Sequence, residues 1–207
     1  MVEIPSGVAA TVAATVEVTD PRSLRGLAHP VRLALIGLLR REGPLTATEA
    51  GERIGESPAS CSFHLRQLAK YGLVEEAGGG PGRRRPWRAT ARSTSWPSVS
   101  SDPEQMAAAT QLSAVVAGRY HAATLEYLER RHAEPADWQR AGGIGDTFLC
   151  LTAAELFRLG EELDALLAPY AARVHEPGLR PEGARQVTFI RVAIPEAPPP
   201  GRPTDAR

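Results

Sequence analysis

Apolar residues recur at three- and four-residue steps along most of the chain, which predicts a mainly helical protein. Between Pro30 and Arg41, for example, Val31, Leu35 and Leu38 fall on one face of a helix. The same periodicity continues over a much longer stretch further along the chain. The predicted helices cover residues 21–28, 30–41, 46–53, 57–71, 103–131 and a segment that begins at 152.

Shorter stretches have the alternation or the β-branched composition that is typical of strands. Residues 12–18 alternate with a period of two, which predicts one strand or an ordered arm. The glycine-rich run 78–82 predicts the tip of a hairpin, with a strand starting at Leu73 and a returning strand at 86–91. Two further strands are predicted at 147–151 and 187–194. The fold class is therefore α+β, mainly α with a small β component.

The helix starts carry strong local signals. Thr46 and Glu49 are spaced as a capping box, and Thr152 with Glu155 repeats that spacing. Ser57 precedes a proline, which is the usual cap-then-proline start of a helix, and Asp20 does the same. Glycines at 55 and 72 can end the two helices of this region in a left-handed conformation. Two helices joined by a tight turn, followed by a hairpin, predict a winged helix-turn-helix.

Changes in composition divide the chain into modules. A stretch rich in serine, threonine and proline after the hairpin favours a linker, and the proline-rich C-terminal segment favours disorder. The second half is expected to be an oligomerisation or ligand module. The expected division is an N-terminal arm or strand at 1–19, a winged helix-turn-helix at 20–92, a linker at 93–103, a helical or α+β module at 104–194 and a disordered tail at 195–207.

Composition narrows the class of protein further. The formal net charge is zero, so any affinity for nucleic acid must come from a local basic patch. The two cysteines, Cys61 and Cys150, form no metal-binding or disulfide pattern, which favours a reducing cytoplasm. The chain has no stretch of about 18 apolar residues and no basic leader followed by an apolar run, so we expect a protein without a membrane partner.

The helix from Ser57 has two chemically different faces. At about 100° per residue, Cys61, Leu65 and Leu68 lie on the core side. A helix in the major groove needs small or hydrogen-bonding residues in its first two turns, and longer donors further along. The opposite face meets that need. Its candidate DNA contacts are Ser57, Ala59, Ser60, Ser62, Phe63, Arg66, Gln67 and Lys70.

Arginines gather at the hairpin. Arg83, Arg84 and Arg85 are consecutive, Arg88 follows, and no acidic residue occurs between Glu76 and Asp102. Such a cluster on a glycine-rich tip suits phosphate contacts or insertion into a minor groove. An arginine run is more often a solvated loop, and only its place in the ordered series of elements favours double-stranded DNA as the partner.

Two segments resemble the ArsR-type winged-helix repressors of bacteria. They are Leu27-Ala28-His29-Pro30-Val31-Arg32-Leu33 and Ser60-Cys61-Ser62-Phe63-His64-Leu65-Arg66-Gln67-Leu68, the latter followed by Tyr71-Gly72-Leu73-Val74. The resemblance covers about residues 20–92. It implies a homodimer that binds a palindromic operator, with the helix from Ser57 as recognition helix and with Ser60, Ser62 and Arg66 at positions that usually meet DNA.

The same resemblance raises the question of a metal sensor. The helix before the recognition helix lacks the cysteine pair of the metal-sensing members. His121 and His132 have the eleven-residue separation of a second family site, but Arg119 and Pro135 stand where its carboxylates would be. Ordinary surface histidines are therefore expected, with no metal and no cofactor. Trp87, Trp96 and Trp138 are packing anchors by default, and an effector pocket for a small molecule is the alternative.

Other classes of function have less support. The chain contains no nucleophile elbow, Walker loop, zinc-protease helix or dinucleotide-binding glycine fingerprint, so we expect no enzyme. A winged helix can also serve as a protein-interaction module, because a fold does not fix a function. The arginine-rich wing opposite small recognition-helix residues favours a dimeric repressor over that alternative.

Overall fold

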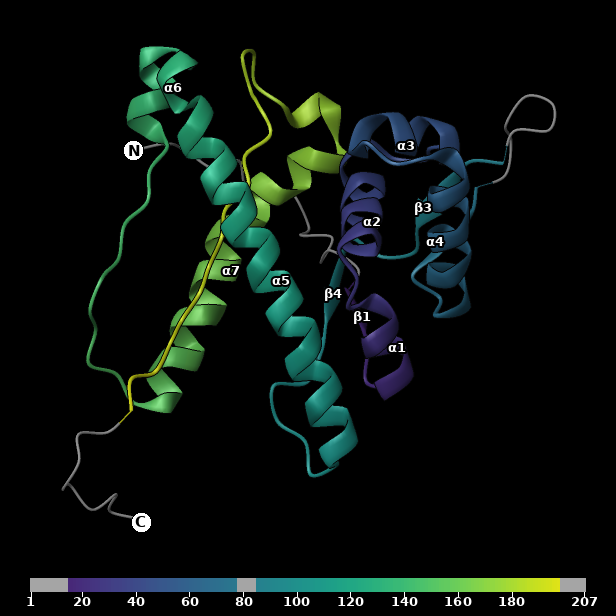
Figure 1. Ribbon diagram of the computed structural model, residues 1–207. Helices are drawn as coiled ribbons and strands as arrows, with labels where there is room; N and C mark the ends of the chain where they lie inside the picture. Colours follow the sequence, from purple (N-terminus) through teal and green to yellow (C-terminus); the bar gives the residue numbers. More distant parts are fainter. Residues whose placement is uncertain (1–14, 78–84, 198–207) are drawn as a thin grey trace.

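The computed structural model describes residues 15–77 and 85–197, and it is mainly helical with two small sheets (Figure 1). The long helix α5 runs between a cluster formed by α1–α4 and a looser second half that contains α6 and α7 (Figure 1). The elements are β1 Thr15–Glu17, α1 Pro21–Leu27, α2 Pro30–Glu42, α3 Ala47–Ile54, α4 Pro58–Lys70, β2 Val74–Glu76, β3 Trp87–Ala89, β4 Ser93–Ser95, α5 Pro103–Arg130, η1 Arg131–Ala133, α6 Ala136–Ala141, α7 Ala153–His175 and η2 Pro177–Leu179.

The expected caps are present at the helix starts. The side chain of Asp20 accepts a hydrogen bond from the Ser23 amide at 2.8 Å, and Ser57 accepts one from the Ser60 amide at 3.1 Å. Both capping boxes are complete, at Thr46 and at Thr152. These bonds satisfy amides that the first helical turn leaves without a partner, so the sequence motifs determine where the helices begin.

The wing is a short antiparallel hairpin. β2 and β3 pair with Val74 opposite Ala89 and Glu76 opposite Trp87. Leu45, in the loop before α3, extends this sheet because its amide and carbonyl bond to those of Trp87 at 3.0 and 2.8 Å. The expected hairpin is confirmed, while its glycine-rich tip, 78–82, lies outside the described residues.

A second sheet differs from expectation. β1 pairs in parallel with β4, with Val16 opposite Thr94, and joins segments 78 residues apart. β4 lies inside the stretch 93–103 that was expected to be a linker. A parallel partner far along the chain supplies the backbone bonds, which no local pattern could reveal. The first part of the expected N-terminal strand lies outside the described residues.

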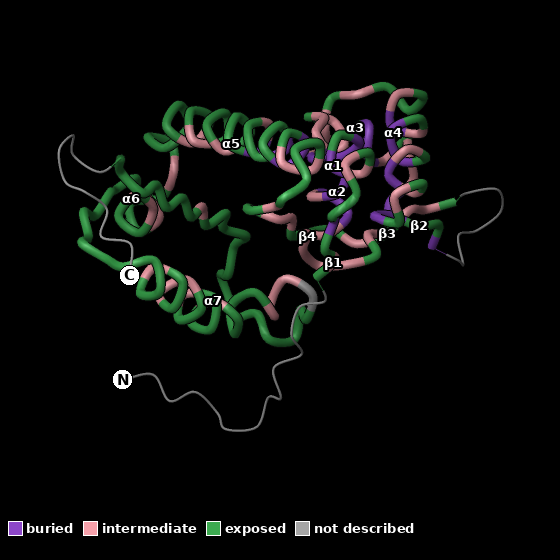
Figure 2. Tube along the Cα trace, turned by 90° about the horizontal axis from the view of Figure 1, so that it is seen from below, coloured by how far each residue is buried: buried purple, intermediate pink, exposed green. Residues whose placement is uncertain are grey.

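One hydrophobic core unites α1–α4 with the start of α5. Leu24 from α1, Leu65 from α4 and Leu112 from α5 are all fully buried in it. Ala108, Ala109 and Val116 of α5 belong to the same cluster. In Figure 2 the buried positions are confined to this region. The long helix therefore completes the core of the α1–α4 cluster over its first four turns.

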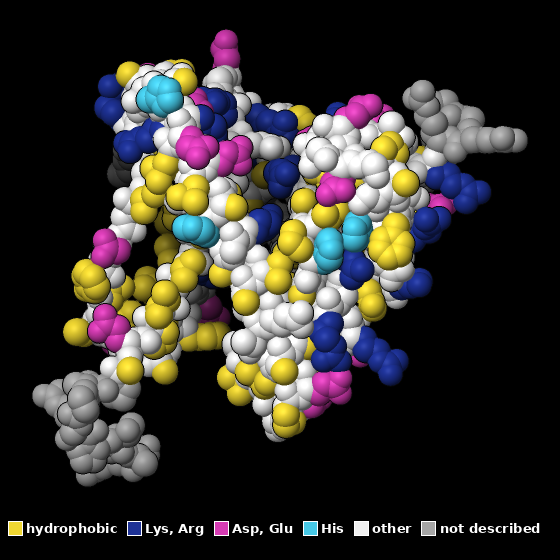
Figure 3. All heavy atoms as spheres, viewed as in Figure 1, with side chains coloured by type: hydrophobic (Ala, Val, Ile, Leu, Met, Phe, Trp, Pro, Cys, Tyr) yellow, Lys and Arg dark blue, Asp and Glu magenta, His cyan; other side chains and the backbone are white. Residues whose placement is uncertain are grey.

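The second half has no comparable core. Among the described residues after Val116, none is buried, and Figure 3 shows hydrophobic side chains on the open face of this half. The prediction of strands at 147–151 and 187–194 is wrong, because both segments are irregular, are exposed apart from Ile190, and belong to neither sheet. An extended segment becomes a strand only with a hydrogen-bonding partner strand, and neither segment has one among the described residues. None of the described helices combines the length and apolar character needed to cross a membrane.

Candidate nucleic-acid interface

Helix α4 has the two-faced character expected from its sequence. Cys61, Leu65 and Leu68 have no exposed surface, whereas Ala59 and Phe63 face outward, the latter 49% exposed. The remaining sequence-predicted contacts are distributed along the outer side and its margins. Ser57, Arg66 and Lys70 are exposed, and Ser60, Ser62 and Gln67 are half-buried.

A tight turn positions α4 against α3. Gly55 adopts φ +72°, in the left-handed region that favours glycine, and ends α3. Gly51 allows the chain to fold back closely, because a Cβ there would lie 2.5 Å from the carbonyl oxygen of Glu56. The Glu56 amide also donates to the Gly51 carbonyl at 3.0 Å. The two glycines thereby fix the helix-turn-helix geometry that presents the outer face of α4.

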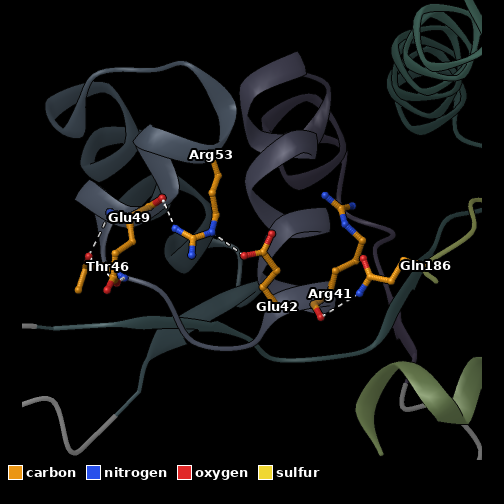
Figure 4. Close-up of polar contacts among 6 residues, drawn as sticks. All are labelled: Arg41, Glu42, Thr46, Glu49, Arg53 and Gln186. Carbon is orange, nitrogen blue, oxygen red and sulfur yellow. Dashed lines mark hydrogen bonds and ion pairs between the residues drawn. The ribbon is translucent and has the colours of Figure 1, made fainter. Parts of the chain in front are cut away.

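Polar contacts hold α3 to the end of α2 (Figure 4). Arg53 pairs with Glu42 at 2.5 Å and donates to the Glu49 carbonyl at 3.1 Å. Glu49 in turn accepts from the Thr46 amide at 2.8 Å. These contacts link the capping box of α3 to the end of α2, so α3 has a defined place beside α2.

An open groove of about 610 Å³ lies between the start of α3, α4 and the wing. Its walls carry donors suited to a phosphate backbone, namely hydroxyls and two arginines, but also three carboxylates. Ser62 and Arg66 come from α4, and Arg85 comes from the wing. The lining residues are Thr46, Ala47, Thr48, Glu49, Glu52, Ser62, Arg66, Glu76, Arg85 and Trp87.

The wing arginines have acidic partners on the opposite strand. Arg88 pairs with Glu75 at 2.8 Å, and Arg85 pairs with Glu76 at 3.5 Å. Both pairs are largely exposed, so each contributes little stability. Sequence reasoning missed these pairs, because they depend on the strand register, which in the structure places 75 opposite 88. Arg83 and Arg84, the other two predicted wing contacts, lie outside the described residues.

The positive groups on α4 have no such partners. Within the part of the chain that the structure describes, Arg66 and Lys70 form no ion pair. Exposed cations without carboxylate partners can meet phosphates without first breaking an internal contact. Arg66 and Lys70 on α4 are therefore more available to an anionic partner than the paired Arg85 and Arg88 on the wing.

His64 lies on the buried side of α4, behind its outer face, and has a structural role. Its ring packs 4.6 Å from that of His29, and Arg32 donates from Nε to its Nδ1 at 3.4 Å. Burial lowers the pKa of His64, and the nearby His29 and Arg32 act in the same direction. The neutral ring can accept the Arg32 bond, so His64 connects α4 to α2.

The cysteines and exposed histidines show no metal-binding arrangement. Over the described residues there is no group of three or more histidine, cysteine or acidic side chains that could hold an ion. Burial raises the pKa of the Cys61 thiol, as expected for a packed hydrophobic side chain rather than a reactive one. His121 and His132 are both exposed.

The tryptophans lie apart. Trp87 lines the groove beside the wing, and Trp96 donates to the Ser113 hydroxyl at 2.9 Å and packs against the core. Trp138 lies in the second half, where the Arg185 guanidinium stacks 4.7 Å from its ring. The three rings therefore do not form one pocket.

Comparison with known protein families assigns the region around α4 to a known type of domain. Residues 27–77 match the family model described as a helix-turn-helix domain, over about a quarter of the chain. No curated protein matches. Among solved structures the chain is similar to NMB1585, a MarR family regulator from Neisseria meningitidis, with 20% identity, 71% of this chain and 79% of that chain covered, and a TM-score of 0.29. A score this low does not establish a common arrangement. The helix-turn-helix match agrees with the observed α3, turn and α4, and with β2 and β3 the region is a winged helix-turn-helix.

Proposed function

We propose that this protein is a sequence-specific DNA-binding transcriptional regulator of the ArsR type, acting as a dimeric repressor at a palindromic operator. The observation that carries the proposal is the outer face of α4, where Ala59, Ser62 and Arg66 follow one another on the side away from the core. A helix with small residues first and a long donor later can approach base edges closely and still reach them.

The wing extends the contact surface. We expect Arg85 and Arg88, together with Arg83 and Arg84 that precede them in the sequence, to bind phosphate or to enter a minor groove. The described arginines must leave Glu76 and Glu75 to do so. These carboxylates weaken binding to any DNA, so they favour sites where base contacts by α4 compensate for the loss.

A second copy of the chain is the proposed partner of the second half. Fourteen large apolar side chains between Leu125 and Ile194 are 42% to 84% exposed. Taking roughly 150–200 Å² for each fully exposed side chain, they present on the order of 1,500 Å² of apolar surface. A standard interface buries about 800 Å² on each partner, so a dimer has ample surface. We further propose that residues 20–92, completed by the start of α5, form the DNA-binding domain, called the reader below. Residues 104–194 would join the readers of two chains in a dimer.

DNA binding is tested by fluorescence anisotropy with random duplex DNA across a salt series. We expect binding that weakens steeply with salt, as counterion release requires. Arg66→Ala with Ser62→Ala should mainly reduce discrimination between operator and random DNA, with Arg158→Ala on α7 as the control. Absence of binding even at low salt would refute the proposal.

The dimer is tested by light scattering on the full chain. Leu166→Asp places a charge on the exposed apolar face of α7, so we expect it to shift the chain toward the monomer. Glu162→Gln on the same helix is the matched control. A wild-type monomer at high concentration, or a fully dimeric Leu166→Asp variant, would contradict the proposed interface.

The alternative function is a protein-interaction winged helix. Glu52 and Glu76 in the groove favour it, because carboxylates repel phosphate and can bind basic segments of a protein. The salt series distinguishes the two proposals, since a protein-binding groove predicts no affinity for duplex DNA.

A further inference from the structure

A second cavity lies on the side of α2 that faces α5. It has a volume of about 140 Å³ and is bounded by α1, α2, β4 and α5. Part of its wall is apolar, formed by Leu27, Ile36, Val116 and the rings of Trp96 and Tyr120. The other part carries the side chains of Arg40 and Arg119. The cavity therefore combines a hydrophobic wall with two guanidinium groups.

Arg40 is anchored at the edge of this cavity. Its Nε donates to the Ala91 carbonyl at 2.9 Å, and a terminal nitrogen donates to the Thr94 hydroxyl at 2.6 Å. Both acceptors are neutral, so these bonds orient the guanidinium without neutralising it. Burial lowers the pKa of Arg40 to about 10, and the charge of Arg119 contributes to that shift.

Further positive charge surrounds Gly37 on α2. A Cβ at this position would lie 3.1 Å from a terminal nitrogen of Arg41 and 3.6 Å from one of Arg119. Within the described ranges, neither of these arginines nor Arg40 takes part in an ion pair. Figure 3 shows Lys or Arg side chains in the hollow between α5 and the reader. Like charges that converge without carboxylates favour an anion between them.

We propose that this cavity binds a small organic acid, whose carboxylate lies between Arg40 and Arg119 and whose apolar body packs against Trp96 and Tyr120. Guanidinium groups match a carboxylate in shape and can donate two hydrogen bonds to it. An engineered apolar cavity of about 150 Å³ accommodates benzene, so one six-membered ring suits the volume. An inorganic anion would leave the apolar wall without a partner.

The bound acid would connect two parts of the molecule. Arg40 holds α2 to the segment that contains β4, while Arg119 belongs to α5. A ligand between them fixes α5 relative to the reader. In a dimer this would set the distance between two recognition helices, a regulatory consequence that rests on the proposed function. The ligand site itself does not rest on the proposed function.

The test is a titration of the full chain, without DNA, with sodium benzoate at constant ionic strength. Binding is followed by calorimetry and by tryptophan fluorescence, because Trp96 lines the cavity. We expect saturable binding with a Kd on the order of 1 mM, as befits so small a ligand. Benzamide, which has the same ring without the charge, and sodium sulfate, which has charge without the ring, should bind at least tenfold more weakly.

Arg119→Gln is the informative variant, because Arg119 is exposed and its loss should leave the fold intact. We expect its Kd for benzoate to rise about tenfold, while Arg158→Gln on α7 leaves the Kd unchanged. Equal benzoate binding by wild type and Arg119→Gln, equal binding of sulfate, or no saturable binding would each overturn the site. A parallel anisotropy measurement with duplex DNA shows whether DNA binding fails separately.

Discussion

The carboxylate of Glu75 should restrain DNA binding by the wing, and its removal should strengthen that binding. Glu75 holds Arg88 at 2.8 Å, and the side chains are 50% and 57% exposed. An exposed pair of this kind contributes about 0.2–1 kcal/mol. Arg88 must give up this contact to reach a phosphate, so Glu75→Gln should tighten binding to random duplex DNA by a factor between about 1.4 and about 5.

Fluorescence anisotropy at two salt concentrations provides the assay. The gain should be largest near 0.01 M salt, where charges interact over about 30 Å, and small near 1 M, where the range falls to about 3 Å. Glu161→Gln on α7 makes the same change in net charge far from the wing and serves as the control. If Glu75→Gln tightens binding as much in an Arg88→Gln background as in wild type, competition for Arg88 is not the cause.

Three further predictions concern stability. Leu65→Ala should lower the free energy of unfolding by about 3–5 kcal/mol in denaturant titrations, because the side chain is fully buried; a loss below 1 kcal/mol would mean that α4 is not packed as described. Thr46→Ala should cost about 1 kcal/mol by removing the capping box, while Thr48→Ala in the same turn should have a smaller effect; equal losses would contradict the cap. Because the pKa of His64 is lowered in the fold, the unfolded chain binds its proton more readily, so stability should fall as pH drops below about 6.5. Melting curves between pH 5 and 8 should show a weaker dependence for His64→Gln, and identical slopes would exclude His64 as the source.

The accuracy of the sequence-based predictions depended on how local each feature is. Thr46, Ser57 and Thr152 begin their helices as predicted, because a cap requires only the residues of one turn. The buried face of α4 also followed from spacing alone. Helical periodicity fixes which side chains share a face, and a single apolar face must turn to the core.

Features that depend on partners distant in the chain could not be predicted from the sequence pattern. Segments 147–151 and 187–194 have strand-like composition, but strand formation requires a neighbour that composition does not specify. The pairing of β1 with β4 was hidden for the same reason. At the wing, the pairing of Glu75 with Arg88 depends on the hairpin register, which the sequence left open. The cavity beside Arg40 requires side chains from α2, β4 and α5 together, and no single segment encodes it.

None of the described residues after Val116 is buried, and this makes the behaviour of the second half depend on the concentration of the protein. If only a second copy covers this surface, the ordering of the second half is bimolecular and follows mass action. Dilution would then loosen α7 while leaving the reader folded, and proteases would cut the C-terminal half first. The proposed repressor would then act only above a threshold concentration of the chain. Dimers formed between an intact and a defective copy would be inactive, so activity would fall as the fraction of such mixed dimers rises.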